Sequence, residues 1–278
     1  MQLLEFYVDD IIKRALLEDI NYIDVASDYL LDDKQCSAYF IAKAEGVLCG
    51  IDVAMRVFEM LDPTFKVSEK LCDGAKVKKG DIICRFSGNV RQLLKGERTA
   101  LNLIQHMSGI ATATNALVRQ CEGTKATVAE TRKTLPGLRV LQKYAVVCGG
   151  GKNHRFNLSD CAMLKDNHID AYGSITGAVN ALRKKVGHTV KIEVETRNLD
   201  EVKEAVAVGA EIIMLDNMSC DQMKQAVDYI DGRAVTEASG NMGERSVHEV
   251  ALTGVDIISF GSITHSVKAF DISMRVDK

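Results

Sequence analysis

Strands and helices alternate regularly in the second half of the chain, and this alternation constrains the fold more than any other feature. Short apolar runs typical of buried parallel strands occur at 127–129, 162–164, 191–194, 211–215, 234–236 and 256–260. Helical stretches separate them at 138–147, 174–186, 199–208, 220–230 and 244–252. This spacing predicts βαβ units and a parallel sheet, because parallel neighbours need a crossover connection.

Polar residues or glycine follow nearly every one of these predicted strands. Lys165, Glu195, Asp216 and Gly261 each stand at a different strand end. Side chains from several strand ends that meet at one mouth are typical of a TIM-type barrel, whereas a doubly wound sheet concentrates its site at one switch point. We therefore predict an α/β fold with a TIM-like barrel of fewer than eight strands.

The first half of the chain follows a different pattern. Strands predicted at 38–42, 46–50, 65–72 and 81–87 surround a helix at 51–61, which indicates a small α+β domain. Residues 24–33 have the pattern of an extended loop. The segment 91–121 is strongly helical, and we expect Ser108-Gly109 to divide it into two helices. We place the domain boundary there, with 1–108 and the tail 268–278 in one domain and 109–267 in the barrel.

Composition excludes several functional classes. The net charge of -3 and the pI near 6.1 argue against a general nucleic-acid binder, which needs a basic face. No apolar run is long enough to cross a bilayer and the first turn is acidic, so we expect a cytoplasmic protein without membrane contact. None of the 8 cysteines forms a Cys-x-x-Cys pair, which favours free thiols over a zinc site.

Cationic side chains gather between residues 130 and 168, in a chain that is acidic as a whole. A cleft lined by one sign of charge attracts ligands of the opposite sign, so this set predicts a site for a polyanion. The basic and imidazole residues of the set are Arg132, Lys133, His154, Arg155, Lys165 and His168.

Lys165 stands at the end of a predicted strand. Its ammonium can clamp an anion, form a Schiff base, or remain a solvated charge. Arg132, Lys133 and Arg155 belong to the same stretch, which favours the anion clamp over a solvated charge.

Glu195 and Asp216 end consecutive predicted strands. Two carboxylates opposite a cationic set can bind sugar hydroxyls, hold the waters of a magnesium ion or act as general acid and base. They can equally serve as counter-ions of the arginines, and the sequence leaves these roles open.

Small-residue turns follow the last two predicted strands, at 238–241 and 260–265. Glycine turns are common where helices end, but barrels also bind phosphate with the loops after their last strands. Because the two turns are consecutive, we predict a phosphate site that includes Ser239, Gly240 and Gly261.

Three motifs together resemble the quinolinate phosphoribosyltransferase family, also called carboxylating nicotinate-nucleotide pyrophosphorylase. They are Glu-Thr-Arg-Lys-Thr-x-Pro-Gly-Leu-Arg from 130, Lys-Tyr-Ala-Val-x-x-Gly-Gly-Gly-x-Asn-His-Arg from 143, and Leu-Lys-Asp-Asn-His from 164. The likeness covers essentially the whole chain, through 96–102, 108–112, 254–256 and 264–265.

The resemblance implies an N-terminal α/β sandwich and a seven-stranded α/β barrel in an obligate homodimer. It also implies condensation of quinolinate with 5-phosphoribosyl-1-pyrophosphate (PRPP) in NAD biosynthesis, which yields nicotinate mononucleotide, pyrophosphate and carbon dioxide. Mg²⁺ would accompany PRPP rather than occupy a dedicated protein site.

The resemblance further implies a role for each matched residue. Arg98 is similar to an arginine that each subunit inserts into its neighbour's site. Lys133 is similar to a residue that also faces PRPP. Glu195 and Asp216 match carboxylates near the ribose hydroxyls and the metal. The quinolinate set would be Arg132, His154, Arg155 and Lys165, and the 5′-phosphate set Ser239, Gly240, Gly261 and His265.

The sequence departs from the family pattern at three places without losing a charged contact. Glu130, Leu135 and Ser262-Ile263 stand where aspartate, threonine and an Ala-Leu pair are usual. We consider three rival functions. They are a Schiff-base aldolase that uses Lys165, a molybdenum-accessory paralogue of the family, and a non-catalytic phosphoribosyl-binding protein.

Overall fold

The computed structural model describes residues 2–242 and 245–277, which form two compact units. The first unit contains residues 2–115, 134–150 and 265–277. The second contains residues 116–133 and 151–264, apart from 243–244. Among the described residues, no helix is both long and apolar enough to cross a membrane.

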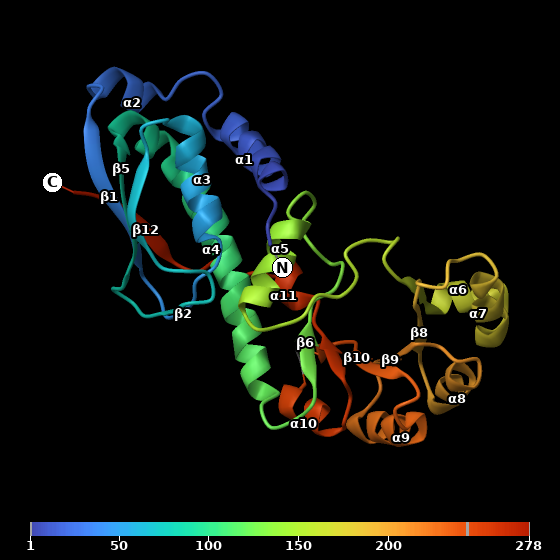
Figure 1. The fold of residues 1–278 in the computed structure, drawn as a ribbon. Coiled ribbons are helices and arrows are strands. Elements are labelled where there is room, and N and C mark those ends of the chain that lie inside the picture. Colours follow the sequence, from blue (N-terminus) through green and yellow to red (C-terminus); the bar gives the residue numbers. More distant parts are fainter. Residues whose placement is uncertain (1, 243–244, 278) are drawn as a thin grey trace. The chain divides into compact units, whose positions relative to one another are not determined.

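The first unit is built on a four-stranded antiparallel sheet with the order β12-β1-β5-β3. Its strands are β1 (Gln35–Ala42), β3 (Lys66–Lys70), β5 (Ile82–Asn89) and β12 (Ile272–Val276). A two-stranded sheet joins β2 (Gly46–Val47) to β4 (Lys76–Val77). The C-terminal strand β12 pairs with β1 along its length, so the end of the chain forms one edge of this sheet (Figure 1).

Six helices lie wholly or partly in this unit. The predicted helix at 51–61 is confirmed as α3, whereas the predicted extended loop at 24–33 is wrong, because α2 lies inside it. The Asp24 carboxylate accepts the N–H groups of Ala26 and Ser27, and this cap allows a short helix where charged residues suggested a loop. The helices are α1 (Glu5–Asp19), α2 (Val25–Leu30), α3 (Ile51–Leu61), α4 (Val90–Gln120), α5 (Arg139–Cys148) and α11 (Ser262–His265).

The expected break at Ser108-Gly109 is also wrong, because α4 is one continuous helix. The glycine serves close packing instead, since a Cβ on Gly109 would collide with the backbone oxygen of Lys268. Ser108 is buried, and its hydroxyl accepts the N–H of Cys49 at 2.9 Å and donates to the Cys49 carbonyl at 3.0 Å. Both residues therefore mark contacts of the helix rather than its end.

Four phenylalanines form the centre of the first unit, and Phe58 of α3 contacts the other three. Its ring centroid lies 5.1 Å from that of Phe86, 5.4 Å from Phe65 and 6.1 Å from Phe40. We expect Phe58→Ala to lower the free energy of unfolding by about 3–5 kcal/mol, because it removes buried surface and leaves a cavity. Chemical denaturation measures this loss. Phe6→Ala, at a 64% exposed residue, is the control, and a loss no larger than the control's would contradict the packing described.

The second unit contains a parallel sheet with the order β6-β11-β10-β9-β8-β7. All six predicted strands are present, and the expected fold class, an α/β barrel-like sheet of fewer than eight strands, is confirmed. The strands are β6 (Thr127–Ala129), β7 (Ala162–Leu164), β8 (Ile192–Thr196), β9 (Ile212–Asp216), β10 (Val235–Ser239) and β11 (Ile257–Ser259). The resemblance implied seven strands, but the sheet has six among the described residues. Beside β6 there is only an isolated parallel bridge between Ala129 and Lys152.

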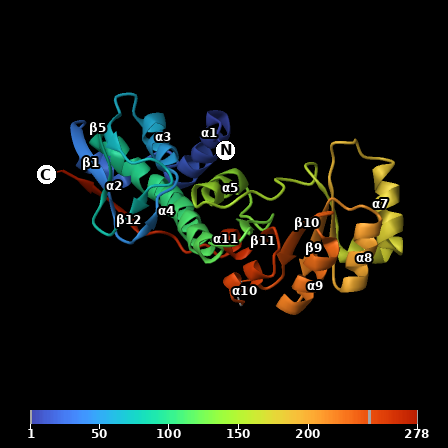
Figure 2. The ribbon, with the colours of Figure 1, turned by 60° about the horizontal axis from the view of Figure 1, so that its bottom comes forward.

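Helices connect successive strands of this sheet, and α8 packs against β8 and β9 (Figure 2). The helix expected at 244–252 is present from Val247, and Glu244 lies outside the described residues. The helices are α6 (Asp166–Tyr172), α7 (Ile175–Arg183), α8 (Leu199–Ala207), α9 (Cys220–Ile230) and α10 (Val247–Leu252). Because all six strands run in the same direction, their C-terminal ends lie on one edge, where the predicted site residues follow them.

Candidate active site

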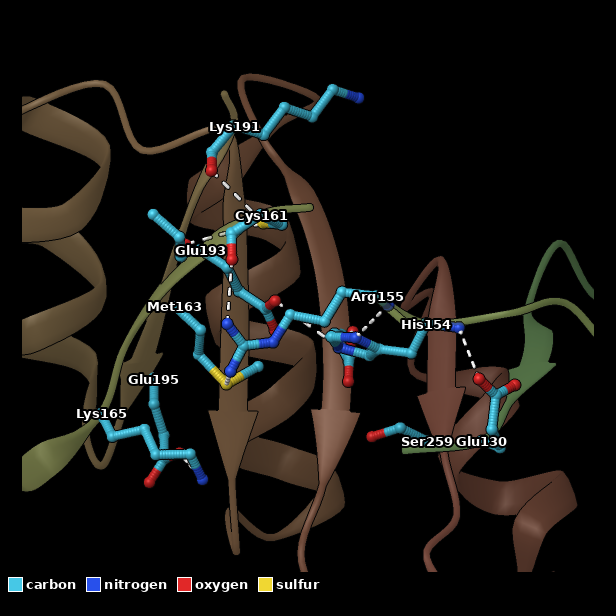
Figure 3. A network of polar contacts seen from close by, with 12 residues as sticks. Glu130, His154, Arg155, Cys161, Met163, Lys165, Lys191, Glu193, Glu195 and Ser259 are labelled. Carbon is cyan, nitrogen blue, oxygen red and sulfur yellow. Dashed lines mark hydrogen bonds and ion pairs between the residues drawn. The ribbon is translucent and has the colours of Figure 1, made fainter. Parts of the chain in front are cut away.

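A histidine and two buried carboxylates meet inside the sheet of the second unit. Nε2 of His154 lies 3.5 Å from a carboxylate oxygen of Glu193 on β8 and 3.4 Å from one of Glu237 on β10. The Glu193 and Glu237 side chains are 1% and 2% exposed. Figure 3 shows His154 and Glu193 directed toward each other. His154 is therefore a positive partner that both carboxylates share, and the charge of Arg155 also acts on Glu193.

This arrangement changes the acidity of His154. Burial lowers the pKa of the imidazole, but the hydrogen bonds and charges of Glu193 and Glu237 outweigh burial and raise the pKa to about 10. The backbone N–H of Arg155, 2.7 Å from Nδ1, suits the neutral ring. Two carboxylates in a dry interior outweigh that single contact and favour the protonated ring at neutral pH, although burial and Glu237 also raise the pKa of Glu193.

The loop that carries His154 is held by Glu130, which follows β6 and is fully buried. Its two carboxylate oxygens accept hydrogen bonds from the Asn153 side chain at 3.2 Å and from the His154 backbone N–H at 3.1 Å. Glu130, which stands where aspartate is usual, therefore still holds Asn153 and His154 in position.

Two arginines of the cationic set are half-buried in different surroundings. The guanidinium of Arg155 donates to the backbone oxygen of Cys161 at 2.9 Å and lies 3.5 Å from the sulfur of Met163, so β7 and the residue before it hold the guanidinium in place (Figure 3). Among the described residues, Nε of Arg132 is buried and has no hydrogen-bond partner. A buried donor without an acceptor is costly, and a bound anion would supply the missing acceptor.

Lys165 and Glu195 form an ion pair at the ends of β7 and β8, with 3.6 Å between Nζ and the carboxylate oxygen. The backbone N–H of Lys165 donates to Nδ1 of His168 at 3.0 Å, so this histidine caps α6. Burial raises the pKa of Glu195, the Lys165 ammonium lowers it, and the Asp216 carboxylate raises it. Asp216 ends the neighbouring strand β9. The two carboxylates thus lie side by side and close to a cation.

The predicted phosphate turns follow β10 and β11. Gly240 has a φ of +91°, and a Cβ there would strike the Asn217 backbone nitrogen at 2.8 Å, so this turn requires glycine. After β11, the Thr264 hydroxyl donates to the Lys133 backbone oxygen at 2.8 Å, which ties the second turn to Lys133. Ser239 and Gly261 are half-buried at these turns.

The structure places ten of the twelve predicted site residues in the second unit. Arg98 and His265 belong to the first unit, where Arg98 is exposed on α4 and His265 ends α11. The ten residues at the strand ends and the loops after them are Arg132, Lys133, His154, Arg155, Lys165, Glu195, Asp216, Ser239, Gly240 and Gly261.

Comparison with known proteins agrees with this geometry. The family model for the N-terminal domain of quinolinate phosphoribosyl transferase matches residues 24–108, and the model for its C-terminal domain matches residues 110–275.

The chain belongs to the quinolinate phosphoribosyltransferase family.

Several members of the family are similar over most of their length. A Bacillus subtilis protein named probable nicotinate-nucleotide pyrophosphorylase (carboxylating) is 42% identical over 96% of this chain and 92% of its own. The chloroplastic nicotinate-nucleotide pyrophosphorylase of Arabidopsis thaliana is 43% identical over 96% of this chain and 82% of its own. The solved structure of the pyrophosphorylase from Francisella tularensis superposes with a TM-score of 0.95, at 41% identity over 99% and 98% of the two chains.

The sequence pattern placed Glu237 among the polar residues at the strand ends of this quinolinate phosphoribosyltransferase family member, but it assigned no role to Glu237 or to Glu193. A signal for them exists, because side chains two residues apart on a strand point to the same face. Glu193 precedes Glu195 by two positions, and Glu237 precedes Ser239 by two. Each therefore lies one layer deeper than a predicted site residue, on the same face of its strand.

Proposed function

We propose that this chain transfers the phosphoribosyl group of PRPP to quinolinate, with loss of one carboxylate as carbon dioxide. The products are nicotinate mononucleotide and pyrophosphate, which places the enzyme among the pentosyltransferases and in NAD biosynthesis. Family membership supports the reaction. The observation within the site that carries the proposal is the buried, unpartnered Nε of Arg132 in a cationic set at the strand ends.

The charge of the site suits quinolinate, which has two adjacent carboxylates. We assign their binding to Arg132, His154, Arg155 and Lys165. A guanidinium can meet a carboxylate with two parallel hydrogen bonds, and protonated His154 adds a fixed positive charge. Lys133, in the loop after β6, would face both quinolinate and PRPP.

The carboxylates at the ends of β8 and β9 suit the transfer step. As the bond from ribose C1 to pyrophosphate breaks, positive charge develops on the ribose ring, and Glu195 and Asp216 can stabilise it electrostatically. The ring nitrogen of quinolinate then bonds to C1 and becomes a pyridinium. When the neighbouring carboxylate leaves as carbon dioxide, the electron pair of the broken bond stays on the ring carbon, where the adjacent pyridinium nitrogen stabilises it. That carbon then takes up a proton, which completes nicotinate mononucleotide. The protein need only orient the reactants and exclude water.

Magnesium fits this donor set, because Glu195 and Asp216 offer the oxygen ligands that Mg²⁺ prefers. When bound with PRPP, the ion would neutralise charge on the departing pyrophosphate. We propose that it arrives with PRPP rather than at a dedicated protein site. The turns with Ser239, Gly240, Gly261 and His265 would hold the 5′-phosphate through backbone N–H groups.

The direct test is an incubation of the purified protein with quinolinate, PRPP and Mg²⁺, with nicotinate as a parallel acceptor. We expect nicotinate mononucleotide to form with quinolinate as the acceptor but not with nicotinate. We expect no product when EDTA removes the Mg²⁺. A folded protein that made no product from either acceptor would contradict the proposal. Borohydride trapping of a carbonyl compound on Lys165 would instead favour an aldolase. Binding of PRPP without release of pyrophosphate would favour a non-catalytic phosphoribosyl-binding protein.

We also propose that the enzyme is a cytoplasmic homodimer in which Arg98 reaches the neighbouring subunit's site. Its exposure on α4 supports this role, since an exposed guanidinium is available to a partner. We keep the division into 1–108 with 268–278 and 109–267. The change of family model between residues 108 and 110 and the pairing of β12 with β1 support it.

Subunit complementation tests the role of Arg98. We expect Arg98→Ala to lower kcat/KM for quinolinate by about tenfold or more, because it removes a charged hydrogen-bond donor. When Arg98→Ala and Lys165→Ala subunits are co-expressed in equal amounts, about a quarter of the sites should be intact, since half the dimers are mixed. Activity is measured per subunit.

Arg119→Ala, at another exposed arginine of α4, is the matched control and should keep full activity. If the co-expressed subunits show no more activity than the two variants alone, Arg98 acts within its own subunit and the shared site is wrong.

A further inference from the structure

Two cysteines and an aspartate meet in the first unit, outside the proposed active site. A sulfur of Cys49, a carboxylate oxygen of Asp73 and the sulfur of Cys148 all lie within 4.8 Å of one another. They come from three separate segments: the residues between β2 and α3, the loop between β3 and β4, and the last turn of α5. Sequence spacing argued against a zinc site, but the fold brings together donors that spacing could not reveal.

The Asp73 carboxylate is held in place by hydrogen bonds rather than by a cation. One oxygen accepts the backbone N–H groups of Gly50 at 2.8 Å and Ile51 at 3.0 Å, and the other accepts the Tyr144 hydroxyl at 2.9 Å. Within the part of the chain that the structure describes, no lysine or arginine pairs with Asp73. Its negative charge is therefore fixed in position, without a side-chain counter-ion among the described residues.

The two thiols differ in their environment. Hydrogen bonding from Cys49 lowers the pKa of Cys148, although burial opposes this, while burial raises the pKa of Cys49. Cys49 is fully buried, whereas Cys148 and Asp73 are only half-buried, so the cluster is open to solvent on one side. Cys148 is thus the thiol on the solvent side of the cluster, next to a carboxylate.

We propose that Cys49, Asp73 and Cys148 bind one soft divalent cation of the zinc class. Such ions take thiolate and carboxylate ligands in a tetrahedron, with metal–sulfur bonds of about 2.3 Å, which puts ligand atoms about 3.5–4 Å apart. The separations in the cluster fit that range with small side-chain shifts. A water or the Tyr144 oxygen would take the fourth position.

This cation would be a different ion from the Mg²⁺ that accompanies PRPP, because Mg²⁺ is a hard ion that prefers oxygen ligands to thiolates. Each thiol gives up its proton to solvent as its sulfur bonds to the ion, so affinity should rise with pH. The ion would tie the C-terminal end of α5 to the residues before α3. We therefore expect it to raise the thermal unfolding temperature of the full chain.

Cobalt(II) is a suitable probe, because thiolate ligands give it an intense charge-transfer absorption in the near ultraviolet. We expect reduced, metal-free protein to bind one Co²⁺ with this absorption, and Zn²⁺ to displace it. Cys148→Ser and Cys49→Ser should abolish the absorption, and Asp73→Asn should weaken binding by about tenfold or more. Cys72→Ser, which removes an exposed thiol next to Asp73, is the matched control and should bind normally.

Circular dichroism establishes that each variant is folded. If Cys49→Ser fails to fold, the half-buried Cys148→Ser decides the test. Unchanged Co²⁺ absorption in Cys148→Ser, or no absorption in protein with all 8 thiols reduced, would overturn the proposal. A Cys49–Cys148 disulfide that persists in reductant would also overturn it. Because the readout is absorbance and not turnover, these outcomes are independent of the proposed transferase activity.

Discussion

Replacing Lys165 by alanine is expected to lower kcat/KM for quinolinate by about a hundredfold or more, the range seen when one fixed transition-state contact is removed. Its ammonium lies 3.6 Å from Glu195, which is long for a charge-assisted hydrogen bond, and its side chain is 50% exposed. Lys165 can therefore leave this loose pair to contact a substrate carboxylate. We expect Arg132→Ala to cost a similar factor, because its buried Nε has no partner among the described residues.

Steady-state kinetics with quinolinate as the varied substrate measures both effects. Lys191→Ala is the matched control, because Lys191 is exposed at the opposite end of the same sheet, before β8 (Figure 3). Lys165→Arg should recover part of the activity if a positive charge is what matters. If alanine at either position left kcat/KM within a few-fold of the wild type, the assigned site would be wrong.

The barrel-like sheet could be predicted because buried parallel strands leave a strong signal. Because both faces of such a strand are covered, its sequence is a continuous apolar run such as Ile-Ile-Met-Leu from 212, and the site residues follow where those runs stop. Lys165, Glu195 and Asp216 were found in this way. The local sequence pattern was sufficient to locate them, because each of these residues lies where its own strand ends and no contact with a distant segment is needed to find it.

Features that depend on distant partners could not be predicted in the same way. Gly109 suggested a helix break, yet its missing side chain makes room for the backbone at Lys268, far along the chain. Cys49 and Cys148 were isolated thiols in the sequence and become neighbours only in the fold. Glu193 was hidden inside an apolar run, and its pairing with His154 depends on a loop that Glu130 holds.

The largest effect of pH is expected when both carboxylates behind His154 are removed. In Glu193→Gln/Glu237→Gln, the interactions that raise the His154 pKa to about 10 are lost and burial remains, so the pKa should fall to 6.5 or below. At pH 8 the charged fraction would then drop by about thirtyfold, from nearly all molecules to about 3%. Quinolinate should bind more weakly at pH 8 and regain affinity below pH 6.

The pH dependence of kcat/KM and an NMR titration of the His154 ring measure this change together. A raised pKa keeps the wild-type imidazole charged until the pH approaches 10, so the wild type should show no loss of binding from this group between pH 6 and 9. Glu211→Gln, a carboxylate paired with Arg183 before β9, is the control and should keep the wild-type profile. If the double variant also kept that profile while its His154 pKa fell, the charge of His154 would have no part in binding quinolinate. The two buried carboxylates would then serve only to position its ring.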